Sequence, residues 1–305
     1  MDYQTLIDAP TWAFIRASAA DYPDDTVSLT VADQRRIYDT MCRAFHRGYP
    51  PGITASDGAI AGVRCRVFDG ARPAVLYLHG GGFVVGGLDS HDDICAEISA
   101  RTGLAVICAD YRLVPEHPHP AAYDDALAVA RALLADGPLL LAGDSAGGNL
   151  AAAVSRGLRG ASGLRGQVLI YPGLGGDPDS GSGLTHAHAP MLTREDVLFY
   201  TDLRHAGPPP ADDPTSAPLQ DHDFSGLPPT LAIGAECDPL CDDAAAYAAR
   251  INAAGGRAMA VVEPGLVHGY LRARATVPRA AASFDRIIAT LTAFAAGDWP
   301  SGDPQ

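Results

Sequence analysis

The sequence is poor in positive charge and contains no cluster of basic residues. Its 305 residues include 22 Lys and Arg against 36 Asp and Glu, which gives a formal net charge of −14. A protein that binds nucleic acid needs a basic stripe or patch that faces the phosphates, and none is visible here. The same acidity opposes docking on anionic membranes. We therefore expect neither nucleic acid nor a membrane among its partners, and a neutral small molecule as its ligand.

Long apolar segments and a cysteine framework are also absent. The longest apolar runs, such as residues 126–134, are too short or too interrupted to cross a bilayer. The first residues do not combine a basic region with an apolar one, so no export signal is predicted and the expected location is the cytoplasm. The six cysteines are scattered, and Cys237 and Cys241 lack further ligands at zinc-site spacing. We interpret them as small buried side chains, with no metal.

What the sequence does contain is an alternation of short apolar segments with helical ones. Nearly continuous apolar runs are typical of buried parallel strands, and they cover residues 63–68, 74–78, 105–109, 139–142, 167–171, 231–235 and 258–263. Helical patterns lie between them, at residues 90–102, 121–135, 149–157, 242–254 and 280–295. This alternation predicts an α/β fold in which a mostly parallel central sheet carries helices on both faces.

Two segments interrupt the alternation. Residues 1–58 contain a helical pattern at 32–46, and residues 173–227 are rich in Gly, Pro and Asp, with one helical pattern at 193–204. Long segments without strands inside a compact domain are often functional. We expect the first to form an N-terminal cap region and the second to contribute to that cap. Four aromatic residues either line the space below the cap or pack between its helices: Trp12, Phe14, Tyr38 and Phe45.

The clearest chemical motif is Gly143-Asp144-Ser145-Ala146-Gly147, which follows a predicted strand and precedes a predicted helix. A sharp strand-to-helix turn of this kind presents a serine hydroxyl above the sheet, and small flanking residues let the backbone close up. The pentapeptide also occurs as an ordinary turn. Its position between strand and helix favours Ser145 as a nucleophile.

A second motif, His79-Gly80-Gly81-Gly82-Phe83, directly follows the strand predicted at residues 74–78. Three successive glycines let backbone N–H groups approach a ligand oxygen closely, as an oxyanion hole requires. A flexible hinge or a phosphate cradle are the alternatives. The glycine spacing does not match the dinucleotide-binding pattern.

A nucleophilic serine needs a base and a carboxylate, which in this architecture follow it in the order acid, then histidine. Asp238 ends the strand predicted at residues 231–235, and His268 is the one histidine that follows it. Asp242 and Asp243 are rival acids, but they open a predicted helix, where an N-cap role is the commoner explanation. The sequence therefore favours Ser145, Asp238 and His268 as a catalytic triad.

These motifs, in this order, resemble the bacterial hormone-sensitive-lipase-like esterases. The resemblance extends from about residue 74 to residue 270, and includes His-Gly-Gly-Gly, Gly-Asp-Ser-Ala-Gly-Gly, Asp238-Pro239-Leu240, His268-Gly269 and the segment 110–118. It implies an α/β-hydrolase fold with a helical cap, residues 59–300 as the catalytic domain with an insertion at about 173–227, and a cofactor-free carboxylesterase for short acyl esters. A homodimer is possible by the same analogy.

The resemblance also implies roles for individual residues. The oxyanion hole would consist of three backbone amides, those of Gly81, Gly82 and Ala146. The segment 110–118 is expected to brace the glycine loop through Tyr111, Arg112 and Glu116, without direct contact with substrate. The motif residues His79, Gly80 and Asp144 are expected to support the two motifs. The sequence departs from the family pattern at four positions, where Trp, Ala, an aromatic residue and Phe are more usual: Phe83, Val114, His119 and Tyr270.

Three alternatives to the carboxylesterase remain open. An amidase or deacetylase would use the same triad. A small-molecule receptor on this scaffold would keep the pocket and lose catalysis, although both Ser145 and His268 are present here. A lipase for long-chain fats is disfavoured because no interfacial apolar helix is evident.

Overall fold

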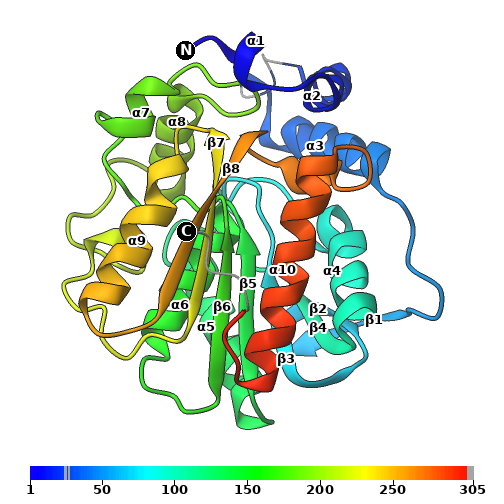
Figure 1. Cartoon of the computed structure of the whole chain (residues 1–305), viewed down its shortest axis with the longest axis vertical. Coiled ribbons are helices and arrows are strands. Elements are labelled where there is room, and N and C mark those ends of the chain that lie inside the picture. The colour runs from blue at the N-terminus through cyan, green and yellow to red at the C-terminus, as the bar shows by residue number, and fades with distance from the viewer. Residues whose placement is uncertain (24–25, 27, 301–305) are drawn as a thin grey trace.

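The computed structural model describes residues 1–23, 26 and 28–300, and an eight-stranded sheet forms its centre (Figure 1). The strands lie in the spatial order β1-β2-β4-β3-β5-β6-β7-β8. Their bounds are β1 (Ala55–Ile60), β2 (Val63–Phe68), β3 (Ala71–Leu78), β4 (Leu104–Ala109), β5 (Leu139–Asp144), β6 (Leu164–Ile170), β7 (Thr230–Cys237) and β8 (Ala258–Val267). The α/β-hydrolase fold expected from the sequence is confirmed, as is the mostly parallel sheet.

Strand direction decides where the loops meet. The strands β3 to β8 run parallel to one another, whereas β2 is antiparallel to both of its neighbours, β1 and β4. Parallel strands leave the sheet at one common edge, where sites of open α/β sheets are found. The turns after β3, β5, β7 and β8, which carry the sequence motifs, therefore gather at the same edge.

Helices cover both faces of the sheet and divide its core in two. One core includes residues of α4 (Leu88–Thr102) and α10 (Pro278–Ala296). The other includes residues of α5 (Ala121–Ala135), α6 (Ala146–Gly157) and α9 (Cys241–Ala253). Successive residues of β3 alternate between the two cores, as the pleat of a strand requires. None of the helices in the described ranges is both long and apolar enough to cross a membrane.

The remaining helices lie over the carboxyl edge of the sheet, at the top of Figure 1. They come from the N-terminal segment, as α1 (Tyr3–Leu6), α2 (Ala9–Asp21) and α3 (Val31–Phe45), and from the insertion, as α7 (Gly181–Thr185) and α8 (Arg194–His205). The two groups touch directly. The hydroxyl of Tyr3 lies 3.3 Å from His186 Nδ1, and the hydroxyls of Tyr22 and Tyr200 are 3.5 Å apart.

The observed elements differ from the predicted ones in two instructive places. β1 was not expected, because its sequence Ala-Ser-Asp-Gly-Ala-Ile lacks an apolar run. It is an edge strand that pairs only with β2 among the described strands, so the sheet begins inside the segment 1–58. α6 begins at Ala146 rather than at 149, since Gly147 and Gly148 are poor helix formers that the elbow nevertheless requires.

Candidate active site

Ser145 sits on a strained turn between β5 and α6. Its φ of 54° and ψ of −119° are uncommon for a residue with a side chain. The neighbouring glycines make the turn possible. A Cβ atom on Gly147 would lie 1.9 Å from the carbonyl oxygen of Leu78, and one on Gly143 would lie 2.4 Å from the carbonyl oxygen of Gly147. The Gly-x-Ser-x-Gly spacing therefore reflects close backbone contact at this elbow.

The fold brings together the three side chains that the sequence order singled out. His268 Nε2 lies 2.8 Å from Ser145 Oγ, and His268 Nδ1 lies 2.7 Å from Asp238 Oδ2. Asp238 is fully buried, and its second oxygen accepts a hydrogen bond from the Leu240 amide at 2.9 Å. A carboxylate accepts from Nδ1–H, which leaves Nε2 free to accept the serine proton.

The glycine loop that follows β3 has a backbone which side chains would not tolerate. Gly81 and Gly82 have φ values of +128° and +59°. A Cβ on Gly81 would lie 2.2 Å from the Val85 carbonyl oxygen, and one on Gly82 would lie 2.7 Å from the Tyr200 ring. Within the described residues, the amides of these two glycines donate to no other protein group. Their N–H groups are thus available to an external oxygen.

Asp144 connects the elbow to the glycine loop. Its Oδ1 accepts hydrogen bonds from the Tyr77 hydroxyl at 2.9 Å and from the Gly80 amide at 3.0 Å. Burial opposes ionisation of this carboxyl, but His91 and Arg272 outweigh that effect and hold the pKa of Asp144 well below its ordinary value. A charged carboxylate next to Ser145 therefore holds Gly80, the first glycine of the motif, in place.

His79 is a structural member of the motif. Its ring stacks on Tyr111 with centroids 4.2 Å apart, and the Tyr111 hydroxyl donates to the His79 carbonyl at 2.6 Å. Burial, followed by the charge of His91, lowers the pKa of His79 to about 3, so the ring is neutral at physiological pH. Tyr111 thus braces the glycine loop by stacking and by hydrogen bonding.

Two of the expected supports lie elsewhere. Arg112 forms an ion pair with Asp125 at 2.8 Å on α5 and does not contact the glycine loop. Glu116 pairs with Arg35 at 2.7 Å on α3. Arg35 in turn donates to the Val84 carbonyl at 2.9 Å, so Glu116 reaches the glycine loop only through the cap. Sequence proximity to Tyr111 was a poor guide, because the chain turns at residues 114–116 and the side chains on either side of the turn reach different partners.

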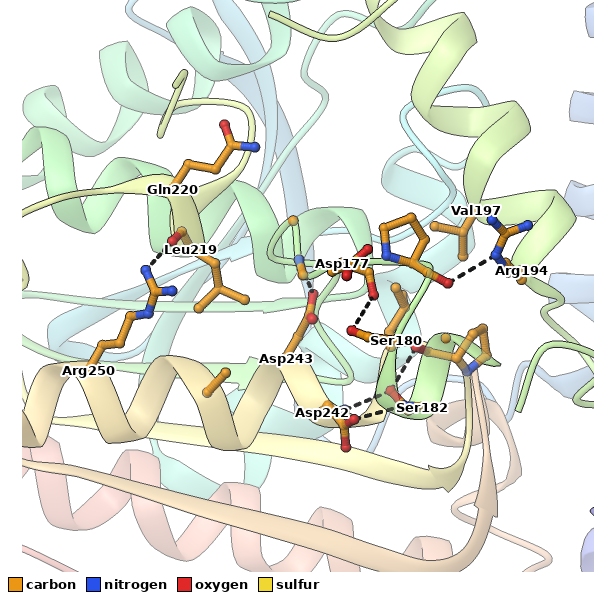
Figure 2. Close-up of a pocket in the computed structure, with 17 residues that line it drawn as sticks. Asp177, Ser180, Ser182, Arg194, Val197, Leu219, Gln220, Asp242, Asp243 and Arg250 are labelled. Carbon is orange, nitrogen blue, oxygen red and sulfur yellow. Dashed lines mark hydrogen bonds between the residues drawn. The ribbon is translucent and has the colours of Figure 1, made fainter. Parts of the chain in front are cut away.

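The rival acids Asp242 and Asp243 do not face His268, and they do not cap α9 either. The N-cap residue is Leu240, and both carboxylates lie in the first turn. Asp242 accepts from the Ser182 amide at 2.7 Å and Asp243 accepts from the Leu174 amide at 2.6 Å, so they hold the insertion against the start of α9 (Figure 2). The expectation that they cap α9 is therefore wrong, because their carboxylate oxygens accept hydrogen bonds from backbone amides that are remote in sequence.

A cavity of about 390 Å³ lies between α9 and the insertion (Figure 2). None of the three residues Ser145, Asp238 and His268 lines it, but Pro239 and Leu240, which follow Asp238 in sequence, do. Its lining includes charged residues of both signs: Asp177, Arg194, Asp242, Asp243 and Arg250.

Two side chains near the site, His91 and Arg272, were not identified from the sequence. His91 lies 3.4 Å from Asp144 Oδ2, and the half-buried Arg272 donates to the Tyr38 hydroxyl at 2.6 Å. His91 could have been identified from the sequence because it is a histidine within a predicted helix that faces the core. Of the aromatic cap residues, Phe14 and Phe45 pack edge-on with ring centroids 5.1 Å apart, which is packing between cap helices.

The cysteines are buried, and the acidic cluster that most resembles a metal site is paired with arginines. All six cysteines are free and buried, and burial raises the pKa of Cys237 to about 11. In the described chain one group, His46 with Asp92 and Asp93, has ligand atoms within 4.8 Å of one another. Asp92 already accepts from Arg66 and Asp93 from Arg274, so arginines occupy the place of a cation.

Comparisons with known proteins agree with this arrangement. The family model described as alpha/beta hydrolase fold matches residues 75–272. Carboxylesterase NlhH of Mycobacterium tuberculosis is 39% identical over 232 residues, which cover 72% of this chain and 73% of that protein. Ethyl acetate hydrolase of Pseudomonas putida is 34% identical over 84% of this chain and 79% of its own length.

Solved structures give the same answer. The hyperthermophilic esterase of the archaeon Pyrobaculum calidifontis superposes with a TM-score of 0.86 at 32% identity, covering 94% of this chain and 98% of that one. An esterase of the bacterial hormone-sensitive lipase family gives a TM-score of 0.85 at 30% identity, with coverage of 93% and 98%. The chain therefore belongs to the hormone-sensitive-lipase-like esterases of the α/β-hydrolase fold, and it is a carboxylic ester hydrolase.

Proposed function

We propose that the protein is a serine carboxylesterase that cleaves short-chain acyl esters through the triad Ser145, His268 and Asp238. The observation that carries the proposal is the continuous chain of two hydrogen bonds, at 2.8 and 2.7 Å, from the serine hydroxyl through the imidazole to a buried carboxylate. Remote segments of the chain supply these groups, and they meet at the edge of the sheet where the glycine loop also ends.

In the first half of the reaction, Ser145 Oγ attacks the ester carbonyl carbon while His268 Nε2 takes the serine proton. The carbonyl oxygen becomes an oxyanion, which accepts hydrogen bonds from the amides of Gly81, Gly82 and Ala146. Two features support this assignment: the free glycine amides and the position of Ala146 as the first residue of α6. An N-terminal helical amide has no partner within the helix, and the helix dipole also favours negative charge there.

The tetrahedral intermediate then collapses, and the alcohol leaves with the proton from His268, which completes the first half. In the second half, water attacks the acyl-enzyme while His268 takes a proton from it, and that proton passes to Ser145 Oγ as the acid product leaves. Asp238 holds the imidazole in the required tautomer and stabilises the imidazolium. No step needs a metal or an organic cofactor.

The preference for short acyl groups is supported by what covers the glycine loop. The Tyr200 ring packs against Gly82, and its hydroxyl meets that of Tyr22 from the N-terminal cap. Two aromatic side chains from different cap segments thus enclose the space next to the oxyanion amides. The ethyl acetate hydrolase relative, by its name, acts on an ester of two-carbon components.

The test is an acyl series of nitrophenyl esters from acetate to palmitate, run on the wild type and on Ser145→Ala. We expect the highest kcat/KM on short chains, with a graded decline because one methylene changes binding only modestly. Ser145→Ala should lose about 10⁶ in turnover. Ser155→Ala is the matched control, since Ser155 is a buried serine of α6 whose hydroxyl has no partner in the described chain.

Two results would contradict the proposal. A fluorophosphonate should label the wild type stoichiometrically and leave Ser145→Ala unlabelled; an unlabelled wild type would indicate a receptor. Turnover of nitroanilides comparable to that of matching esters would indicate an amidase or deacetylase instead.

We also propose that the exposed edge strand β8 pairs two copies into a homodimer. β8 is the last strand of the sheet, and Val262 within it is 42% exposed. An open edge with an apolar side chain is a surface that proteins commonly cover by pairing.

A further inference from the structure

The helix α8 of the insertion carries a buried guanidinium next to the active site. Arg204 is only 5% exposed, although among the described residues it forms no direct ion pair with a carboxylate. Burial lowers the pKa of Arg204 to about 9, which reflects the cost of keeping this cation away from water. A buried charge without a paired carboxylate calls for other compensating contacts.

The first compensating contact is with the glycine loop. The guanidinium carbon of Arg204 lies 3.8 Å from the ring centroid of Phe83, directly over its face. Phe83 follows Gly82 in sequence and has a φ of +65°, a left-handed conformation that costs energy in a residue with a Cβ atom. Gly81 and Gly82 also have positive φ, so three successive residues depend on neighbours to hold this backbone.

The second contact is with the helix that follows the nucleophile. Arg204 Nη2 donates to Asn149 Oδ1 at 3.2 Å, and Nη1 donates to the Ser216 carbonyl at 2.9 Å. Asn149 lies in the first turn of α6, and its own amide group donates to the Gly173 carbonyl at 2.7 Å. The guanidinium therefore holds the helix end whose first amide is that of Ala146.

A third contact, with His119, fixes the orientation of the guanidinium. His119 Nε2 lies 2.9 Å from Asp213 Oδ2, and His119 Nδ1 lies 3.5 Å from Arg204 Nη2. A proton held on Nε2 by the carboxylate leaves the Nδ1 lone pair to accept from the arginine. Phe83 and His119 thus both contact Arg204.

We propose that Arg204 is a positioning residue that holds the two halves of the oxyanion hole in register, the glycine loop through Phe83 and the start of α6 through Asn149. The inference rests on the proposed function, because it assumes that the amides of Gly81, Gly82 and Ala146 bind one oxyanion. One planar group stacks on the first half and donates hydrogen bonds to the second, which an ammonium cannot do equally well.

The experiment separates binding of the oxyanion from binding of the substrate. A trifluoromethyl ketone forms a hemiketal when Ser145 Oγ adds to its carbonyl carbon and the serine proton passes to His268, which places an oxyanion in the hole. The non-fluorinated methyl ketone reports ground-state binding. In Arg204→Met we expect kcat/KM to fall and the inhibition constant of the trifluoromethyl ketone to rise in parallel, each by about 10- to 100-fold, somewhat less than the loss of a whole donor. The methyl ketone should bind within about twofold of wild type.

Three further variants separate positioning from folding. Arg36→Met removes an arginine of the cap helix α3 that pairs with Asp33, and this variant should keep wild-type values. Arg204→Lys should remain impaired in kcat, because it keeps the charge and loses the planar fork. In Arg204→Ala, guanidinium chloride at a non-denaturing concentration should restore part of the lost kcat, whereas equal urea or sodium chloride should not.

The outcomes that overturn the inference are specific. They are a folded Arg204→Met with wild-type kcat/KM, an Arg204→Lys with wild-type kcat, or a loss of kcat without weaker trifluoromethyl ketone binding. If Arg204→Met does not fold by circular dichroism, the lysine and Phe83→Leu variants decide, since Phe83→Leu keeps the hydrogen bonds to Asn149 and should weaken the same inhibitor. Failure of the proposed function itself would show separately, as a wild type that fluorophosphonate does not label.

Discussion

Asp238 illustrates how much one residue depends on its surroundings. Both of its oxygens are engaged, one by His268 and the other by the Leu240 amide, and the side chain is fully buried. Such a carboxylate is held in a fixed position from which it can orient the imidazole. Asp242, four residues further, has the same chemistry and binds the insertion instead.

Asp238→Asn should lower kcat by about 10⁴, because the amide would stabilise the wrong tautomer of His268. The measurement is steady-state hydrolysis of a short nitrophenyl ester. Asp242→Asn is the matched control: it keeps an acceptor for the Ser182 amide and should retain most activity. Equal losses in the two variants would show that the acid has been assigned to the wrong residue.

Position 82 requires glycine for two reasons, its positive φ and the lack of space for a side chain. Gly82→Ala should reduce kcat/KM by about 10-fold or more, because the new Cβ would lie 2.7 Å from the Tyr200 ring and the loop would shift. Gly103→Ala provides the comparison, since Gly103 has a φ of +71° with nothing within 4 Å of its added Cβ. A similar loss in both variants would indicate strain alone.

At the scale of elements, α9 shows how a helix end can serve a neighbouring segment. Asp243 lies in its first turn, and its carboxylate accepts from the amides of Leu174 and Gly176 in the insertion. Burial nevertheless raises the pKa of Asp243 to about 6, from an ordinary value of 3.8. Its ionised form is therefore disfavoured in the folded protein relative to the unfolded chain.

The sign of the resulting pH dependence follows from that shift. Because the pKa of Asp243 is raised on folding, its contribution to stability is greatest below pH 3.8 and is lost as the pH rises toward 6. Asp243→Asn, which mimics the protonated form, should match the wild type near pH 4 and be more stable by roughly 3 kcal/mol above pH 7. Urea unfolding of both proteins across this range measures the difference; a constant difference would contradict the prediction.

Whether an element could be predicted depended on how its residues are buried. The strands β3 to β7 are covered on both faces, so their apolar runs identified them. β1 is an edge strand with exposed residues, and no pattern marked it. The helices α3 and α8 were expected within a residue or so of their ends, but nothing in their sequences indicated that Arg35 and Arg204 would turn inward.

On the scale of the whole molecule, arginine connects segments that are remote along the chain. All 22 basic residues are arginines. Arg35 joins α3 to Glu116, and Arg274 joins the turn after β8 to Asp93 of α4. These pairs fix the cap and the His268 loop relative to the sheet, although the molecule carries an overall excess of acid.

The proposed homodimer can be tested at this scale. Val262→Lys places a charge on the exposed edge of β8 and should shift the equilibrium toward monomer, as light scattering after size exclusion would record. Leu184→Lys changes a side chain of α7 that is 57% exposed, away from β8, and should leave the wild-type state unchanged. A wild type that is monomeric at every concentration would contradict the proposal.

The sequence by itself determined the strands β2 to β8, the elbow at Ser145, the glycine loop and the order of the three residues that we propose as a triad. The strands and turns depend on local geometry, because buried strands need apolar runs and tight turns need glycine. The tertiary structure decided which polar groups meet. It placed Arg112 on Asp125, Asp243 on the insertion and Arg204 beneath Phe83. Such partners are chosen by the desolvation of charges in a packed interior, and no pattern along the chain encodes that.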